Sequence, residues 1–213
     1  MYFGMRHNAA VRTQTAAPVV TAPVAPAPAF ASAPPTPSPA ATLPDVPAGQ
    51  FDSARKPVDA VETPVIDASK LLIPVQGIRA AQLVDTFTQA RSNGRVHDAI
   101  DIMAPAGTPV LAATDGSVAK LFASNLGGTT LYEFDASGTV AYYYAHLQAY
   151  APGVVEGKPL KQGEVIGYVG STGNASPSAP HLHFAIFVLG PEKRWWQGTA
   201  INPYPLLSGA AAR

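Results

Sequence analysis

Imidazole and carboxylate groups are the side chains of this sequence best suited to metal binding or catalysis. The 213 residues contain five histidines and no cysteine. The absence of cysteine excludes disulfides, thiolate metal sites and cysteine nucleophiles. Four histidines, His97, His146, His181 and His183, lie in or beside segments with the composition of β-strands. A metal site in this chain would therefore use histidine and carboxylate donors, which suit zinc.

The spacing within two short motifs indicates which side chains share a surface. Side chains alternate across a strand, so His181 and His183 of the His-Leu-His motif point to one face. His97 and Asp101 are four residues apart, which also gives them a common face on a strand, and the small Ala99 between them leaves room for an ion. A catalytic zinc usually has three protein ligands and one open position. The pattern predicts a metal site but leaves open which three residues bind.

Short apolar runs separated by turn residues predict an all-β, mainly antiparallel domain that positions these groups. Val, Tyr, Phe and Thr dominate the runs, as expected for half-buried strands. Residues 135–138 (Asp-Ala-Ser-Gly) predict a hairpin turn, and residues 82–91 fit either a short helix or a loop. His146 ends one predicted strand, on which Tyr142 and Tyr144 share its side. The predicted strands are 71–75, 99–103, 109–113, 116–123, 129–135, 139–146, 165–170 and 181–188.

The N-terminal third differs in composition and is predicted to be a disordered tether. Residues 9–50 contain 13 alanines and 10 prolines, and residues 51–70 stay polar and interrupted by proline. Proline at this density removes hydrogen-bond donors, and few large apolar groups are present to offset chain entropy. We therefore assign residues 1–70 to a disordered Ala/Pro-rich extension, residues 71–207 to one folded domain and residues 208–213 to a C-terminal tail.

Charge and hydropathy argue against several classes of partner. Basic and acidic residues number 14 each, so the basic excess typical of nucleic-acid-binding proteins is missing. No run of 18 apolar residues is present, so no transmembrane segment is expected. The start of the sequence, MYFGMRHNAA, lacks the apolar region of a signal peptide. Two alternatives stay open: an export signal has been removed, or the reading frame starts upstream of this chain, where an envelope anchor would also lie.

Seven segments occur in a characteristic order: Leu72–Gly77, His97–Val110, Ala113–Val118, Tyr144–Leu147, Gly163–Ala175, His181–Phe184 and Ile201–Pro205. In content and order they resemble the lysostaphin-type (LytM-like) zinc metallopeptidase domains of bacterial cell-wall enzymes. The resemblance covers residues 71–207. It departs from the family at Ala99, where the family often has glycine, a small change that leaves the candidate ligands in place.

The resemblance implies a role for each of the five residues. His97, Asp101 and His183 would bind one Zn²⁺, and His146 and His181 would form the catalytic pair. It also implies a β-sandwich-like metallopeptidase fold and a zinc-activated water that hydrolyses peptide cross-links or stem peptides of bacterial peptidoglycan. Peptidoglycan lies outside the cytoplasmic membrane, so the periplasm or cell envelope is the expected location.

Two other functions fit parts of the pattern. A catalytically silent relative would bind the cell wall or activate an amidase, but such relatives usually lose metal ligands, and all five site residues are present here. A cupin-like metal binder would place His-x-His ahead of its other ligands, followed closely by glutamate. Here His-Leu-His comes last, and the next glutamate is Glu192. The sequence therefore favours the peptidase.

Overall fold

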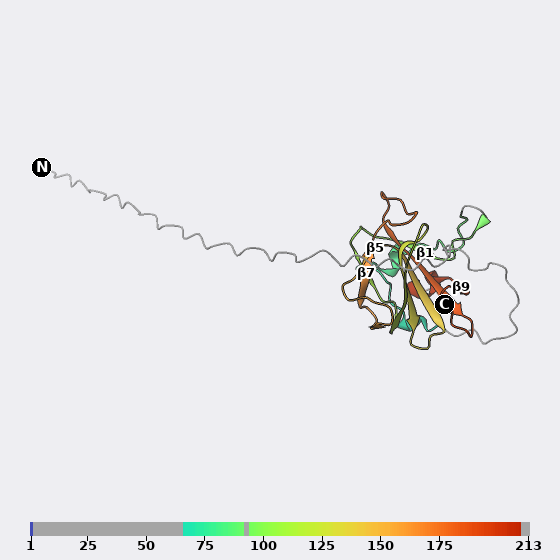
Figure 1. Cartoon of the computed structure of the whole chain (residues 1–213). Coiled ribbons are helices and arrows are strands. Elements are labelled where there is room, and N and C mark those ends of the chain that lie inside the picture. Colours follow the sequence, from blue (N-terminus) through green and yellow to red (C-terminus); the bar gives the residue numbers. More distant parts are fainter. Residues whose placement is uncertain (2–65, 92–93, 210–213) are drawn as a thin grey trace. The chain divides into compact units, whose positions relative to one another are not determined.

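The computed structural model describes residue 1, residues 66–91 and residues 94–209. Nine strands of this described part join in one sheet, and every strand pair is antiparallel. Figure 1 draws the strands of the domain as arrows. The predicted all-β, mainly antiparallel fold is confirmed, and the disorder predicted for the tether concerns residues that lie almost entirely outside the described ranges. The strands are β1 (Ile100–Met103), β2 (Pro109–Leu111), β3 (Gly116–Ser124), β4 (Gly128–Asp135), β5 (Val140–Tyr150), β6 (Pro159–Leu160), β7 (Val165–Val169), β8 (His181–Leu189) and β9 (Gly198–Ile201).

The long strand β5 changes its partner part-way along its length. Residues 140–145 pair with β8, and residues 147–150 pair with β7. His146 stands between the two stretches, has a φ of 60° and donates its amide N–H to the Gly127 carbonyl, just before β4. The register of β5 against β4 also shifts near this point. The change of partner therefore fixes where His146 sits in the sheet.

Alternate side chains of β5 enter two different apolar clusters. Tyr142 and Tyr144 belong to the larger cluster together with Phe184 of β8, whereas Tyr143 belongs to the smaller cluster together with Phe187. Each of these five rings is at most 3% exposed. Burial of one such ring contributes about 1.5–3 kcal/mol to folding. The two clusters therefore fix β5 against β8, the two strands that carry three of the predicted site residues.

Elements near the start of the domain differ from the prediction. Residues 71–75 form no strand, and only Val75 makes an isolated bridge, to Val110. The 3-10 helix η2 (Ala80–Gln82) precedes a loop, so the loop alternative for residues 82–91 is the correct one. Leu71, Ile73 and Val75 of this apolar run contact the core, so the run reflects burial and not a ladder of strand hydrogen bonds.

Three short elements at other positions are absent from the predicted set: β6, β9 and the helix α1 (Pro203–Ser208). β6 has two residues, too few for a periodic pattern to reveal. β9 has four residues and pairs with β8 at the end of the domain. The helix begins with a proline at its first position, after Asn202, whose side chain accepts the Tyr204 amide N–H. Both are standard signals for a helix start.

The described chain contacts the core before residue 71. The 3-10 helix η1 (Ala68–Lys70) lies in the segment assigned to the tether, and Ile66 packs against the larger apolar cluster. The domain boundaries at residues 71 and 207 stay predictions. Among the described residues, no helix has the length and apolar character needed to cross a membrane.

Candidate metal centre and active site

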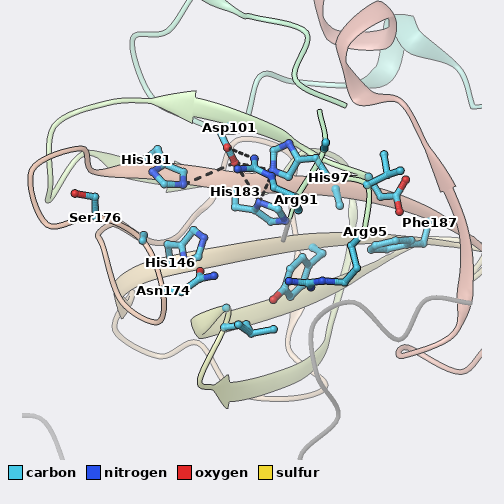
Figure 2. Close-up of a pocket in the computed structure, with 18 residues that line it drawn as sticks. Arg91, Arg95, His97, Asp101, His146, Asn174, Ser176, His181, His183 and Phe187 are labelled. Atoms are coloured by element: carbon cyan, nitrogen blue, oxygen red, sulfur yellow. Dashed lines mark hydrogen bonds and ion pairs between the residues drawn. The ribbon is translucent and has the colours of Figure 1, made fainter. Parts of the chain in front are cut away.

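Three donor atoms converge beside the β1–β8 pair (Figure 2). His97 Nε2 lies 3.0 Å from both Asp101 Oδ1 and His183 Nδ1, and the latter two atoms are 3.1 Å apart. Donor atoms bound to a tetrahedral zinc at about 2.0–2.1 Å lie about 3.3 Å from one another. The triangle therefore has nearly the size that one tetrahedral ion requires, and its two imidazoles and one carboxylate suit zinc.

The pairing of β1 with β8 brings two of the donors together. Asp101 is the register partner of His183, and Met103 is the register partner of His181. Side chains directly opposite each other on neighbouring strands lie on the same face. Leu182, between the two histidines, is buried in the larger apolar cluster, as strand alternation requires. The antiparallel register thus explains why this aspartate and histidine meet.

His97 reaches the cluster in a different way from the one predicted. β1 begins three residues later, so His97 does not lie on a strand. Asp98 has a φ of 53°, a left-handed conformation that interrupts the extended chain. The Gln89 carbonyl accepts the His97 amide N–H at 3.0 Å, and a second main-chain bond to Phe87 holds the next residue. His97 therefore meets Asp101 because a held turn places it there, and not because of strand alternation.

Main-chain carbonyls orient three of the imidazoles. Their Nδ1 atoms lie 2.8–2.9 Å from carbonyl oxygens, which belong to Thr86 for His97, Thr172 for His146 and Ala179 for His181. A carbonyl can only accept, so each neutral ring carries its hydrogen on Nδ1 and keeps a lone pair on Nε2. The Nε2 atoms are therefore the ones available to a metal ion or a proton.

His146 and His181 form a second pair beside the triangle. Their ring centroids are 4.9 Å apart, and the His146 ring lies 5.6 Å from the His183 ring. His181 Nε2 is 3.7 Å from Asp101 Oδ1, which is too long for a hydrogen bond. Both rings line the same pocket as the three donor residues (Figure 2). The structure therefore brings all five candidate residues together, three in the triangle and two beside it.

The face of His146 differs from the prediction. Tyr143 lines the pocket with His146, whereas Tyr142 and Tyr144 lie in the larger apolar cluster. The positive φ of His146 breaks the alternation of β5 and turns the side chain to the opposite face. The Tyr144 hydroxyl donates to Glu133 inside the core. The Tyr143 ring lies edge-on to the His183 ring at 6.0 Å, and it forms a wall of the pocket.

Burial and the neighbouring imidazoles set the charge of the site. Burial raises the pKa of the Asp101 carboxyl, but the His183 and His97 imidazoles outweigh burial and hold this pKa well below its ordinary value. Burial lowers the pKa of His183. Burial, together with the nearby His183, lowers the pKa of His146 to about 4. At neutral pH the site thus offers a carboxylate at Asp101 and neutral imidazoles at His146 and His183, the forms in which these groups bind a cation.

Two residues that contact the triangle were not singled out by the sequence analysis. Thr86 accepts from His97 through its carbonyl and from the Asp101 amide N–H through its hydroxyl, at 3.1 Å. The Arg91 guanidinium lies 2.8 Å from Asp101 Oδ2. Both residues lie in the loop before His97, where neither periodicity nor spacing marks them. The only available signal is the general one that metal ligands have outer hydrogen-bond partners.

Comparison with known proteins identifies the family. Residues 95–203 match the family described as "Peptidase family M23". This stretch is more than half of the chain and contains all five candidate residues. The chain belongs to peptidase family M23.

Relatives of this M23 chain include named peptidases. It is 33% identical to the L-Ala–D-Glu endopeptidase of Bacillus subtilis over an alignment of 129 residues, and the match covers 57% of this chain and 38% of that protein. It is 42% identical over 96 residues to the DD-carboxypeptidase/endopeptidase Mpg of Neisseria meningitidis, which is 45% of this chain and 21% of Mpg. The M23 chain thus spans well under half the length of these relatives.

A solved peptidase structure also resembles this M23 chain in three dimensions. The catalytic domain of the antimicrobial peptidase lysostaphin from Staphylococcus simulans matches this M23 chain with a TM-score of 0.50 at 32% sequence identity. The match covers 59% of this chain and 90% of that domain. The part that is shared is therefore nearly the whole of a catalytic domain.

Proposed function

We propose that this M23 chain is a zinc-dependent endopeptidase that hydrolyses peptide cross-links or stem peptides of bacterial peptidoglycan. One observation carries the proposal: the donor triangle of His97, Asp101 and His183 shares a pocket with His146 and His181. The names of the relatives support the substrate class, because L-Ala–D-Glu and DD bonds involve D-amino acids, which are characteristic of peptidoglycan.

In this proposal the triangle holds the ion. His97 would bind through Nε2, Asp101 through Oδ1 and His183 through Nδ1, the atoms that face one another. Bound zinc would polarise the scissile carbonyl and make a water molecule more acidic. Three protein donors leave room for substrate and water, as in other catalytic zinc sites. The carboxylate offsets part of the ionic charge, so the site keeps a net attraction for a negatively charged oxygen.

The pair beside the triangle would carry the proton transfers. The Nδ1–H groups of His146 and His181 are used by main-chain carbonyls, so Nε2 is the proton-accepting atom of each ring. One Nε2 takes the proton of the attacking water, and a ring protonated at Nε2 donates to the carbonyl oxygen or the leaving amine of the substrate. The proposal assigns these tasks to the pair and not to individual rings.

The substrate determines the expected location and the use of the rest of the chain. Peptidoglycan lies outside the cytoplasmic membrane, so we propose that the protein acts in the periplasm or cell envelope. We propose that residues 71–207 form the catalytic domain and that the Ala/Pro-rich chain ahead of Ile66, which itself packs on the core, is a tether that lets this domain reach the wall. Residues 208–213 would be a short tail.

The proposal is tested with the full-length, zinc-loaded protein and isolated peptidoglycan. The protein is incubated with the wall material with and without a chelator, and released fragments are identified by mass spectrometry. We expect chelator-sensitive cleavage at a peptide bond, and the fragment masses distinguish stem peptide, direct cross-link and glycine bridge. A protein with one bound zinc that releases no fragments would contradict the proposal and favour a catalytically silent relative.

A further inference from the structure

The Asp101 carboxylate is shared between two groups that approach different oxygens. Oδ1 faces His97 and His183 at 3.0 and 3.1 Å, whereas Oδ2 lies 2.8 Å from an Arg91 guanidinium nitrogen. Figure 2 shows Arg91 and Asp101 in the same group of side chains as the two histidines. A guanidinium–carboxylate pair at this distance is a charge-assisted hydrogen bond, which is short and directional. The orientation of this carboxylate is therefore constrained from both sides.

The backbone around Arg91 is hydrogen-bonded to the segment that leads into the His97–Asp101 motif. The Arg91 amide N–H donates to the Arg95 carbonyl at 2.9 Å, and Ala90 bridges Val96 in antiparallel fashion. The guanidinium thus approaches Asp101 from a hairpin-like pairing that ends directly before His97. Residues 86–91 contact the His97–Asp101 motif, although they precede the stretch matched to the family, which begins at residue 95.

We propose that Arg91 is a positioning residue for Asp101, which holds Oδ2 so that Oδ1 alone is presented to the two imidazoles. This inference rests on the proposed function, because it assumes that Asp101 binds zinc. The terminal torsion of an aspartate is broad, so without the guanidinium the carboxylate can turn and present both oxygens. Presentation of one oxygen keeps the protein donors at three and the remaining position open for substrate and water.

The experiment compares the full-length protein with three variants: Arg91→Gln, Arg91→Lys and Arg95→Gln. Arg95 lines the same pocket, so Arg95→Gln removes the same charge and leaves the Arg91–Asp101 pair in place. Zinc affinity is measured by competition with a chelating dye. Coordination is measured from the visible absorption of the Co²⁺-loaded proteins, whose bands weaken as the coordination number rises. Circular dichroism identifies any variant that fails to fold, and Arg91→Lys provides the conservative change.

We expect Arg91→Gln to weaken zinc binding about 10-fold or more and to weaken the Co²⁺ bands. Arg91→Lys should give an intermediate effect, because one ammonium can replace part of the guanidinium contact. Arg95→Gln should leave both readouts near those of the unmodified protein. Equal effects of the two glutamine variants would overturn the inference, because charge alone would then account for them.

An unchanged affinity and spectrum in Arg91→Gln would also overturn it. A failure of the proposed metal site gives a different result: the unmodified protein itself would bind neither zinc nor cobalt. That outcome would contradict the metal site and, with it, the role of Arg91. The two failures are therefore distinguishable before any variant is compared.

Discussion

The ring of His146 meets the ring of His181 edge to face, with the two centroids 4.9 Å apart. One ring comes from the point where β5 changes its partner strand, and the other from the first residue of β8. Both rings lie beside the donor triangle and not within it. This arrangement predicts that metal binding and turnover can be separated by mutation.

The first prediction contrasts a ligand with a member of the pair. His183→Ala removes one of three donors and should abolish stoichiometric zinc binding. His146→Ala leaves the triangle intact, so it should retain zinc while peptidoglycan hydrolysis falls about 100-fold or more. Metal content is measured by mass spectrometry and hydrolysis by fragment release. Loss of zinc from His146→Ala would show that the ligand assignment is wrong.

The second prediction concerns the hydroxyl of Thr86, which accepts the Asp101 amide N–H at 3.1 Å. Thr86→Val keeps the shape but removes the acceptor, and an unsatisfied amide of this kind costs about 1–3 kcal/mol. We expect the free energy of unfolding to fall by that amount and zinc binding to weaken about 10-fold. Thr86→Ser keeps the hydroxyl and is the control. Indistinguishable zinc affinities for the valine and serine variants would contradict the role of the hydroxyl.

The third prediction concerns Glu133, a fully buried carboxyl group in β4. Its Oε2 accepts from the Tyr144 hydroxyl and, at 3.3 Å, from the Ala113 amide, while Oε1 has no hydrogen-bond partner among the described residues. Burial raises the pKa of Glu133 from 4.5 to about 7, against the opposing effect of the Tyr144 hydroxyl. The folded protein therefore holds this proton more tightly than the unfolded chain does.

Stability should consequently fall as pH rises. The contribution of Glu133 to the free energy of unfolding is fully present below about pH 4.5. It is lost as the pH rises through about 7, and the whole change is about 3 kcal/mol. Urea unfolding of the metal-free protein at pH 5 and pH 8 measures it. Glu133→Gln, which carries no charge at either pH, should remove this part of the difference. An identical pH dependence in the wild type and the glutamine variant would refute the prediction.

The fourth prediction concerns Gly128, whose φ is +66° and which lies against Thr172. A Cβ here would come within 2.2 Å of Thr172 Oγ1 and 2.4 Å of its carbonyl carbon, and that carbonyl holds His146 Nδ1. Gly128→Ala should therefore reduce hydrolysis at least about 10-fold with zinc retained, because the ring loses its orientation.

The matched control is Gly153→Ala, at a φ of +77° with no atom within 4 Å of the added Cβ. Both alanine variants bear the left-handed backbone penalty of about 1–2 kcal/mol. Only Gly128→Ala should also lower the rate of hydrolysis, measured at a temperature where both variants are folded. Equal rates for the two variants would show that Thr172 is not displaced in the way the packing requires.

The long strands and the site motifs were predictable because they carry strong local signals. The β8 range predicted from alternation, 181–188, is one residue shorter than the observed strand, and its two histidines share a face as expected. The hairpin turn at residues 135–138 also forms, with the Gly138 amide bonded to the Asp135 carbonyl at 2.9 Å. In each case the pattern and the fold depend on the same neighbouring residues.

The details that were missed depend on contacts between distant segments. Asp98 and His146 both adopt a positive φ. Aspartate and histidine do so more often than most residue types, but nothing in the local pattern marks these two positions. The side of β5 on which His146 projects follows from its exchange of partners between β8 and β7, which a reading of β5 alone cannot detect. Arg91 likewise meets Asp101 only after the chain between them has folded back.

Two loops hold His146 from separate directions, because its amide bonds to Gly127 and its ring bonds to Thr172. The loops are also tied to each other, since the Asn174 amide N–H donates to the Leu126 carbonyl at 3.0 Å. A graft that exchanges only one of them would shift the His146 ring as well. Redesign of substrate preference in this pocket therefore has to transplant both loops as a single module.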